Sequence, residues 1–302
     1  MRARLLPLAG MLLAAGSSMA GAQSVGRMLE YDVRNVVKDM VGVWASPFHS
    51  SGRDWLLAGG VLAAGAAITP WDDNIDRWFL ANQNSSTWSV LKELRPGGGA
   101  YTGKTITPVV AGLYVIGLAT KSTHLRDGVM GCAASYASSS IARNYVLYQV
   151  IGRVRPDSAK VHPANFAPVP TRQNDQYEFE AFPGNTWGKH SLPGGHVANI
   201  AACAGFLGNR FDMGYAEPIP YLIAAGVGIG RLVDRRHWTS DTFIGAIYGY
   251  AVGKEVARRS LRRREEERSR RDVVSPAGPE EARNFYFAPS SRGVTFGMQW
   301  IF

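Results

Sequence analysis

Cysteine is scarce in this chain, and paired metal-binding motifs are absent. Only two of the 302 residues are cysteines, and no His-Glu-x-x-His motif or closely spaced cysteine pair occurs. Zinc-finger proteins and zinc proteases are therefore excluded, and we predict no metal site. Cys132 and Cys203 allow one pairing, which an oxidising compartment would permit. The alternative, which we favour, is two small buried side chains among the Gly, Ala and Ser residues of helices.

Long apolar runs are also missing. The apolar stretches reach only about 12 to 17 residues, short of the roughly 20 that a membrane-spanning helix requires. The mean hydropathy of −0.10 agrees with this shortage. We therefore expect a water-soluble or peripheral protein, although the segments that start at Trp55 and Thr105 are apolar enough to insert into a bilayer.

Acidic residues are outnumbered, 24 against 33 Lys and Arg, and the net charge is +9. Much of the excess lies between Arg258 and Arg271. This run indicates a solvated helix end held by salt bridges, and the alternative is an electrostatic tether to anionic lipid head groups. No aromatic residue is interleaved with its charges, which argues against nucleic acid as a partner.

The N-terminus has the pattern of a secretory signal peptide over residues 1–22. Arg2 and Arg4 precede an apolar run from Leu5 to Ala15, and small residues follow up to Ala22. Such a segment is removed on export. We therefore expect an exported protein of the periplasm or cell envelope, whose mature chain begins at Gln23, and contact with a membrane stays open.

Alternation typical of strands is missing until the C-terminus, and helical periodicity dominates elsewhere. We predict an all-α helical bundle over residues 23–272, with a core at 100–254, and a tail at 273–302 that contains a β-hairpin. A long connection at 156–192 is expected to shape a pocket. Helices are expected at 29–40, 55–69, 105–119, 127–152, 196–207, 220–232 and 240–258.

A first group of polar residues lies at the start of the last predicted helix. His237 and Asp241 are four residues apart, so on a helix they would share one face, where the carboxylate could accept a ring N–H of the imidazole. That hydrogen bond would fix the tautomer and leave the other nitrogen free to attack. Arg231 could bind two oxygens of a phosphate in front of this nucleophile.

A second and a third group add a further cation and a proton donor. Arg155 would provide another guanidinium, and Gly194 and Gly195 lead into His196 at the expected start of a helix. Glycine allows backbone N–H groups to approach an anion, and a helix N-terminus favours negative charge. His196 could then protonate the departing oxygen as a general acid.

The order and spacing of these residues resemble the superfamily of type-2 phosphatidic acid phosphatases and vanadium haloperoxidases. That pattern has a Lys seven residues before Arg-Pro, then Pro-Ser-Gly-His, then Ser-Arg followed after five residues by His and after three more by Asp. The matching residues are Arg155, Pro156, Pro193, Gly195, His196, Arg231, His237 and Asp241. The resemblance implies that His237 is a nucleophile oriented by Asp241, that His196 is the proton donor, and that Arg155, Arg231 and the Gly195 N–H bind phosphate.

Three positions depart from the family pattern. The family Lys falls on Tyr148, and the two family serines fall on Gly194 and Gly230. Tyr148 retains an O–H donor and Gly194 a backbone N–H, so we keep both as candidate phosphate-binding residues. The sequence does not choose among five nearby cations that could replace the ammonium group. They are Arg143, Arg153, Lys189, Arg235 and Arg236.

The resemblance implies a metal-independent acid phosphatase that needs no cofactor. We expect it to hydrolyse phosphomonoesters or pyrophosphate, with lipid phosphates favoured, through a phosphohistidine and with a mildly acidic optimum. Two alternatives stay open. One is a haloperoxidase that binds vanadate as its cofactor in the same pocket, and the other is a non-catalytic envelope protein that binds phosphate or lipid.

Overall fold

The computed structural model describes residues 19–82, 85–88, 102–157, 174–184, 187–274, 282–290 and 293–301. The chain divides into two compact units, Met1–Ser260 and Leu261–Phe302, and each is described by itself. Most of the expected signal peptide and part of the expected loop at 156–192 lie outside the described residues. The signal peptide and the domain boundaries therefore stay predictions.

Helices make up most of the described chain, which confirms the all-α prediction. The α-helices are α1 (Met19–Ala45), α2 (Gly52–Ile68), α3 (Asp72–Asn82), α5 (Thr102–Ala119), α6 (Thr123–Ala142), α7 (Tyr148–Val150), α8 (Gly195–Arg210), α9 (Pro218–Val233) and α10 (Thr239–Val274). The 3₁₀ turns are Ser46–His49, Thr69–Trp71, Ser86–Trp88, Trp187–Lys189 and Gly214–Ala216, and a π-turn spans Arg143–Leu147.

Each predicted helix is present, although the one expected at 127–152 ends at Ala142 and is continued by the π-turn, α7 and a strand. The structure also adds two features that the sequence patterns did not indicate. α3 was missed because polar residues interrupt its 11 residues. The prediction of no strand before the C-terminus was also wrong, because β1 (Ile151–Arg153) pairs antiparallel with β2 (Phe179–Ala181). Strands of three residues are too short to show alternation.

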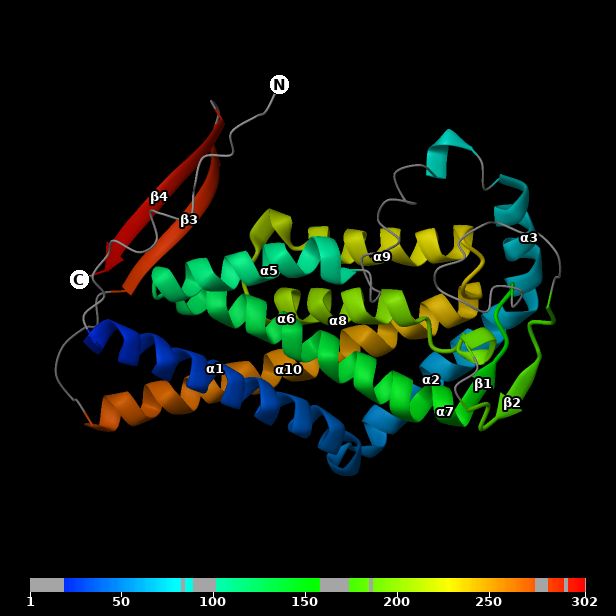
Figure 1. Ribbon diagram of the computed structural model, residues 1–302, viewed down its shortest axis with the longest axis horizontal. Coiled ribbons are helices and arrows are strands. Elements are labelled where there is room, and N and C mark those ends of the chain that lie inside the picture. Colours follow the sequence, from blue (N-terminus) through cyan, green and yellow to red (C-terminus); the bar gives the residue numbers. More distant parts are fainter. Residues whose placement is uncertain are drawn as a thin grey trace, which may run out of the picture. The chain divides into compact units, whose positions relative to one another are not determined.

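The helical body is centred on α6, which packs against α1, α5 and α8, while α9 packs on α8 (Figure 1). Its apolar core draws on α1, α6, α8 and α10. The buried members are Val43, Ala134, Ala202, Phe206, Val252, Val256 and Ala257. None of the helices in the described ranges is long and apolar enough to cross a membrane.

Glycines allow α10 to lie directly on the N-terminal half of α8. Gly245, Gly249 and Gly253 are spaced by four residues, so they form one stripe on the helix. A Cβ atom at these positions would overlap the backbone of Gly194, Ala198 and Ala202, respectively. Only hydrogen at each site leaves room for this contact, and the beginning of α10 is thereby held against the loop that precedes α8.

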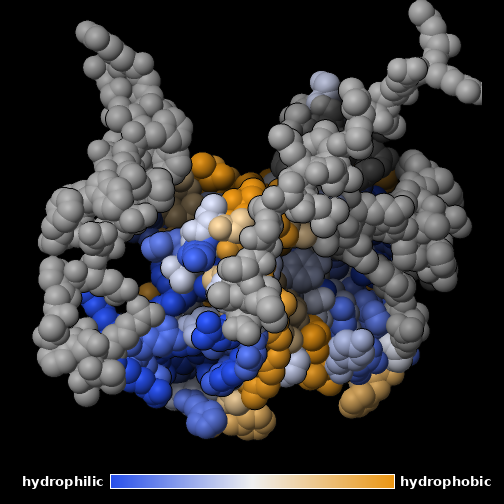
Figure 2. Space-filling view, turned by 60° about the vertical axis from the view of Figure 1, so that its left-hand side comes forward, coloured by the Kyte–Doolittle hydropathy of each residue, from blue (hydrophilic) through white to orange (hydrophobic). Residues whose placement is uncertain are grey.

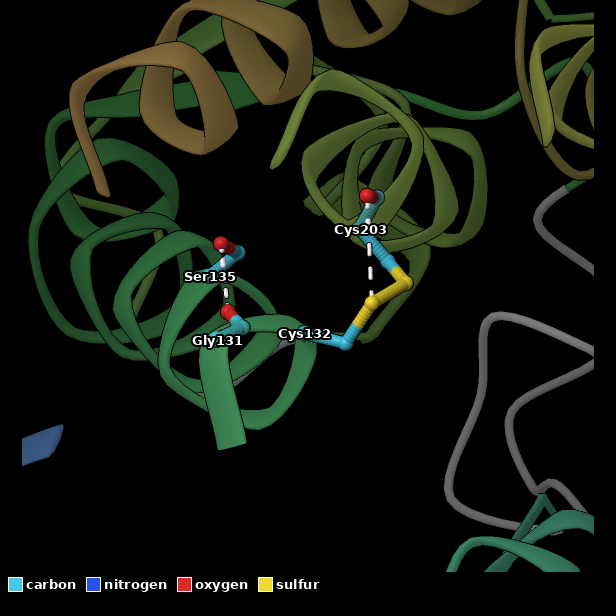
Figure 3. The surroundings of a disulfide bond; sticks show 4 residues. All are labelled: Gly131, Cys132, Ser135 and Cys203. Atoms are coloured by element: carbon cyan, nitrogen blue, oxygen red, sulfur yellow. Dashed lines mark hydrogen bonds between the residues drawn. A yellow bond between two sulfur atoms is a disulfide. The ribbon is translucent and has the colours of Figure 1, made fainter. Parts of the chain in front are cut away.

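A disulfide links α6 to α8, contrary to the favoured interpretation of two separate small side chains. Cys132 and Cys203 are joined with their Cα atoms 4.5 Å apart (Figure 3). The ring of Phe206 packs where a side chain on Gly131 would lie, so the two helices come close beside this bond. Local composition could not show this approach, because it arises from contact between segments 71 residues apart.

The buried face of α1 is partly apolar and partly polar. Val36 and Met40 do pack against the core, but Leu29, Val33 and Val37 are exposed. Val43 is buried near the end of the helix, and the buried positions before it include the polar residues Asp32, Asn35 and Asp39. Asp32 is stabilised there by Arg126, 3.5 Å away, and by the Tyr114 hydroxyl, which donates to it over 2.9 Å.

The second unit contains the end of α10 and the predicted C-terminal hairpin. β3 (Ala282–Ser290) pairs antiparallel with β4 (Gly293–Ile301), and Ser290 lies opposite Gly293 at the turn. This pairing confirms the predicted hairpin. In the basic part of α10, Arg264 pairs with Glu267 one turn away, as expected for a helix end held by salt bridges.

Candidate active site

Backbone hydrogen bonds bring the three groups of predicted residues together. The Arg155 N–H donates to Gly188 O over 2.8 Å, and the Ser191 N–H donates to Arg153 O over 3.1 Å. The loop that continues from Ser191 reaches the start of α10, where the Gly194 N–H donates to Asp241 O over 2.8 Å. Segments that are distant in the sequence therefore form one side of a common site.

His237 lies just before α10 and is almost fully buried, with 2% of its surface exposed. Its Nδ1 is 2.8 Å from the carbonyl oxygen of Ser191. A carbonyl can only accept, so Nδ1 must be the donor and the proton of the neutral ring lies on it. The lone pair of Nε2 is then available to an electrophile, which is the state that a nucleophilic histidine requires.

The predicted hydrogen bond between His237 and Asp241 is absent. The argument from four-residue spacing assumed that both residues lie on one helix, but α10 begins at Thr239, after His237. Asp241 instead caps that helix, because its carboxylate accepts the Trp238 N–H over 3.1 Å. It also accepts the Ser191 hydroxyl over 2.5 Å. Asp241 therefore bears on His237 through Ser191, the residue that fixes the tautomer.

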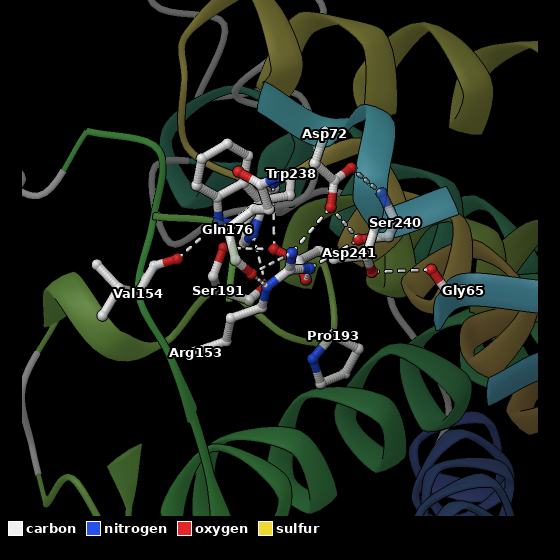
Figure 4. A network of polar contacts seen from close by, with 12 residues as sticks. Gly65, Asp72, Arg153, Val154, Gln176, Ser191, Pro193, Trp238, Ser240 and Asp241 are labelled. Atoms are coloured by element: carbon white, nitrogen blue, oxygen red, sulfur yellow. Dashed lines mark hydrogen bonds and ion pairs between the residues drawn. The ribbon is translucent and has the colours of Figure 1, made fainter. Parts of the chain in front are cut away.

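Arg153 joins this arrangement to α3 through a buried network (Figure 4). Its guanidinium donates to Asp241 over 2.6 Å and to Asp72 over 2.8 Å. Asp72, at the start of α3, also accepts the N–H and the hydroxyl of Ser240. Both carboxylates and the guanidinium are almost fully buried, and a buried charge of this kind is tolerated only when it is paired and hydrogen-bonded. The network holds the first turn of α10 in place.

Arg155 is anchored by backbone carbonyl groups on both sides of the site. Its two terminal nitrogens donate to Arg236 O and to His190 O, each over 2.9 Å. Burial lowers the pKa of Arg155 to about 10, with Arg236 contributing, which still leaves the guanidinium charged at neutral pH. His190 itself stacks on Tyr148 with ring centroids 4.9 Å apart. His190 thus lies beside Arg155 and Tyr148.

His196 stands in the first turn of α8, whose N-cap residue Gly194 provides no side-chain cap. The first N–H groups of a helix have no partner within it, so this N-terminus is suited to an anion. Burial lowers the pKa of His196 well below its usual range, and four arginines lower it further. They are Arg231, Arg155, Arg143 and Arg236.

His237 is exposed to the positive charge of some of the same arginines. Burial lowers its pKa well below the usual range, with further contributions from Arg155, Arg231 and His196. Arg231, at the end of α9, is buried and lies 3.4 Å from Asp234. Two neutral imidazoles among several cations therefore form a centre of positive potential, which would attract a phosphate and whose histidines gain protons more readily once it is bound.

Two predicted phosphate-binding groups are occupied by other partners. The Tyr148 hydroxyl donates to Pro193 O over 2.9 Å, and the Gly194 N–H donates to Asp241 O. A Cβ atom on Gly194 would lie 2.9 Å from that same oxygen, so the serine of the family pattern would not fit here without a backbone shift. Gly195 is buried at the N-terminus of α8. Of the two glycine N–H groups predicted to bind phosphate, that of Gly195 has no partner within the helix, because it lies in the first turn.

The structure separates the five cations that could replace the family lysine. Arg153 pairs with two buried aspartates, Arg235 makes a bidentate ion pair with Asp76, and Lys189 pairs with Glu180. Arg143 and Arg236 remain, and both act electrostatically on His196. In the described part of the chain no group of three or more His, Cys, Asp or Glu side chains is placed to hold a metal ion.

Sequence reasoning missed Ser191 and the two aspartates of α3. Ser191 contributes its carbonyl group, which every residue type has, so only its position two residues before Pro193 could have drawn attention to it. Asp72 and Asp76 lie more than 70 residues before the nearest group. Their position in the first two turns of α3 is typical of surface helices, and no local pattern indicates that they are buried.

Comparison with known proteins agrees with the class of protein that this fold and site define. The family model described as the PAP2 superfamily matches residues 128–265, a range that contains all three groups. Over this range the chain is similar to members of that family. The lipid A 1-phosphatase of Porphyromonas gingivalis is 34% identical over 85 residues, which cover 26% of this chain and 18% of that protein. The chain thus matches less than a fifth of the length of this relative. No solved structure matches the chain.

Proposed function

We propose that this protein is a metal-independent acid phosphatase that acts on phosphate esters, with lipid phosphates as the favoured substrates. The observation that carries the proposal is the pair of histidines: His237 presents an unprotonated Nε2, and His196 lies among the same arginines at an uncapped helix N-terminus. This is the arrangement that nucleophilic attack on phosphorus and protonation of a leaving oxygen require. The match to the PAP2 superfamily supports the same activity.

In the first step, Nε2 of His237 attacks phosphorus while the bond from phosphorus to the leaving oxygen breaks. His196, which takes up a proton when the negatively charged substrate binds, gives that proton to the leaving oxygen, so the leaving group departs as an alcohol. In the second step, His196 takes a proton from water, the water oxygen bonds to phosphorus, and the N–P bond returns its electron pair to His237. The phosphate is released and both rings regain their initial states.

The arginines would stabilise the charge on the transferred group. Arg155 and Arg231 are positive charges near both histidines, and each lowers the pKa of the two rings. Together with the Gly195 N–H they would bind the equatorial oxygens of the phosphoryl group. Preorganised donors of this kind typically contribute about 10²- to 10³-fold each to the rate.

The preference for lipid phosphates and a place at a membrane surface in the cell envelope belong to the same proposal. The relative's printed name supports a lipid substrate. Apolar side chains also gather at the surface of the described residues (Figure 2), and α2 alone exposes Trp55, Leu56, Leu57 and Leu62. Exposed apolar area of this extent is typical of surfaces that contact a partner or a membrane. Co-sedimentation with anionic lipid vesicles should weaken when Leu56 and Leu57 are both changed to Gln.

Phosphate release by the purified protein from lipid phosphates, soluble phosphomonoesters and pyrophosphate tests the activity. His237→Ala should lower turnover at least about 10³-fold, because the nucleophile is lost. His124→Ala is the matched control, since His124 is an exposed histidine elsewhere on α6, and its activity should equal that of the wild type. A phosphorylated peptide containing His237, recovered under alkaline conditions, would identify the intermediate. Phosphate binding without turnover on every substrate would instead indicate a non-catalytic binding protein.

A further inference from the structure

Arg143 occupies an unusual electrostatic position at the edge of the site. It is the first residue of the π-turn that follows α6, and only 5% of its surface is exposed. One terminal nitrogen donates to Gly195 O and to Asn199 Oδ1, each over 2.8 Å, and the other lies 3.4 Å from the Ser140 hydroxyl. Each of these partners is a neutral group.

No carboxylate balances this buried charge. Among the described residues none lies within ion-pair distance of Arg143, and its Nε has no hydrogen-bond partner. Two other buried arginines differ in this respect, because Arg153 pairs with Asp72 and Asp241, and Arg235 pairs with Asp76. An arginine does not discharge by losing its proton. A bound anion would therefore offset the cost of burying a charge that no described carboxylate pairs with.

The guanidinium lies against the start of α8. A Cβ atom on Gly195 would be 3.0 Å from both Cζ and Nε of Arg143 and 2.8 Å from the Tyr148 hydroxyl. The guanidinium carbon is also 5.5 Å from the centroid of the Tyr148 ring. Glycine at position 195 thus leaves the space in which the cation reaches the first turn of α8, next to His196.

We propose that Arg143 supplies the positive charge that position 148 lacks, and that it acts as a positioning and electrostatic residue for a phosphate held between His196 and His237. The inference rests on the proposed phosphatase function. The hydrogen bond from Nη1 of Arg143 to Gly195 O holds the first turn of α8 in place. The positive charge of Arg143 acts on both the bound anion and His196. The contribution of Arg143 to the lowered pKa of His196 is consistent with this proximity.

Two substitutions separate charge from structure. Arg143→Gln keeps an amide donor for Gly195 O and removes the charge, while Arg143→Lys keeps the charge. We expect the inhibition constant of inorganic phosphate and the KM to rise about 10- to 100-fold in Arg143→Gln, from the loss of one charge close to the anion. The high-pH limb of kcat/KM should move to higher pH in the same variant, because a cation that disfavours protonation of His196 is gone. In Arg143→Lys the high-pH decline of kcat/KM should occur at the same pH as in the wild type, and the KM should stay within about 5-fold of the wild-type value.

Relocating the charge provides a rescue experiment. Adding Tyr148→Lys to Arg143→Gln should recover at least part of the lost phosphate affinity, which a purely structural role of Arg143 would not allow. Arg210→Gln is the matched control, since Arg210 pairs with Asp127 over 2.9 Å and is also largely buried. This control should lower the melting temperature and leave phosphate affinity and the pH limb unchanged.

Several results would overturn the inference. Unchanged phosphate affinity and an unchanged pH limb in Arg143→Gln would do so, and so would a loss in Arg143→Lys as large as that in Arg143→Gln. If Arg143→Gln does not fold, the phosphate affinity of Arg143→Lys still tests whether the charge at position 143 is what binding requires. If the wild type shows no turnover, the proposed function fails, but calorimetric titration of wild type and Arg143→Gln with inorganic phosphate still tests Arg143, and equal affinities would refute its role.

Discussion

The helical body and the site are stabilised by different interactions. In the body, α6, α8 and α10 meet through glycine, alanine and a disulfide, and the buried side chains there are mostly apolar. At the site, α3, β1, the loop before α8 and the start of α10 meet through charged groups that are almost fully buried. The first region resembles an ordinary core, while the second consists largely of ion pairs.

This difference indicates what each region contributes. Close packing of apolar groups stabilises the folded state directly, whereas a buried ion pair roughly balances its own desolvation and mainly fixes geometry. Changes in the body should therefore alter stability and leave the chemistry intact. Changes in the Asp72–Arg153–Asp241 network should alter both, because the same groups hold His237 through Ser191.

The largest effect is expected from Arg153→Met, which would leave two aspartates buried without their partner. We expect the free energy of unfolding to fall by about 3 to 5 kcal/mol and phosphatase activity to be lost at temperatures where the variant is still folded. Urea unfolding and phosphate release measure the two effects. Lys189→Met is the control, because its ion pair with Glu180 is partly exposed and should be worth at most about 1 kcal/mol. Full activity in Arg153→Met would contradict the role given to the network.

Removal of the disulfide should affect the body alone. The double variant Cys132→Ser and Cys203→Ser should lower the free energy of unfolding by about 2 to 5 kcal/mol, since the bond closes a long loop in the unfolded chain. The kcat/KM at 25 °C should be unchanged, because Cys203 lies seven residues along α8 from His196, a distance of about 10 Å. A matching loss of activity in folded protein would show that the two regions are coupled.

A smaller loss of stability is expected from Gly249→Ala. A Cβ atom there would overlap the carbonyl group of Ala198, and overpacking of this kind typically costs about 1 to 3 kcal/mol. Gly59→Ala is the matched control, because nothing lies within 4 Å of that position on exposed α2. Alanine should stabilise the helix slightly there. Equal melting temperatures for the two variants would argue against the close packing of α10 on α8.

The most subtle effect concerns pH. His196 must carry a proton when the leaving group departs, so activity should be lost as pH rises through its pKa. Burial and the arginines lower that pKa in the free protein, so kcat/KM should decline from below pH 6.5. Bound phosphate adds negative charge and raises the pKa of His196 again. The decline of kcat at high pH should therefore occur at a higher pH than the decline of kcat/KM. A kcat/KM that rises steadily above pH 8 would rule out His196 as the acid.

Part of this organisation was accessible from the order of residues. Helical periodicity located the helices, and alternation located the hairpin, because both patterns are local. The spacing of Arg155, His196 and His237 indicated a family whose model matches the same range. The prediction of a contact between His237 and Asp241 was wrong, since it depended on where α10 begins. The pairing of the cysteines was also wrongly judged, because it depends on how closely two helices approach.

The sequence by itself therefore determined the class of fold and indicated the residues that we propose to carry the chemistry, since these follow from local periodicity and from the types of side chain at fixed intervals. Only the tertiary structure decided how those residues are held. It fixed the tautomer of His237 through a backbone carbonyl group and connected Asp241 to α3 through Arg153. It also left Arg143 as a buried cation with no carboxylate partner in the described part of the chain. These features depend on burial and on contacts between distant segments, and no local pattern in the chain encodes them separately.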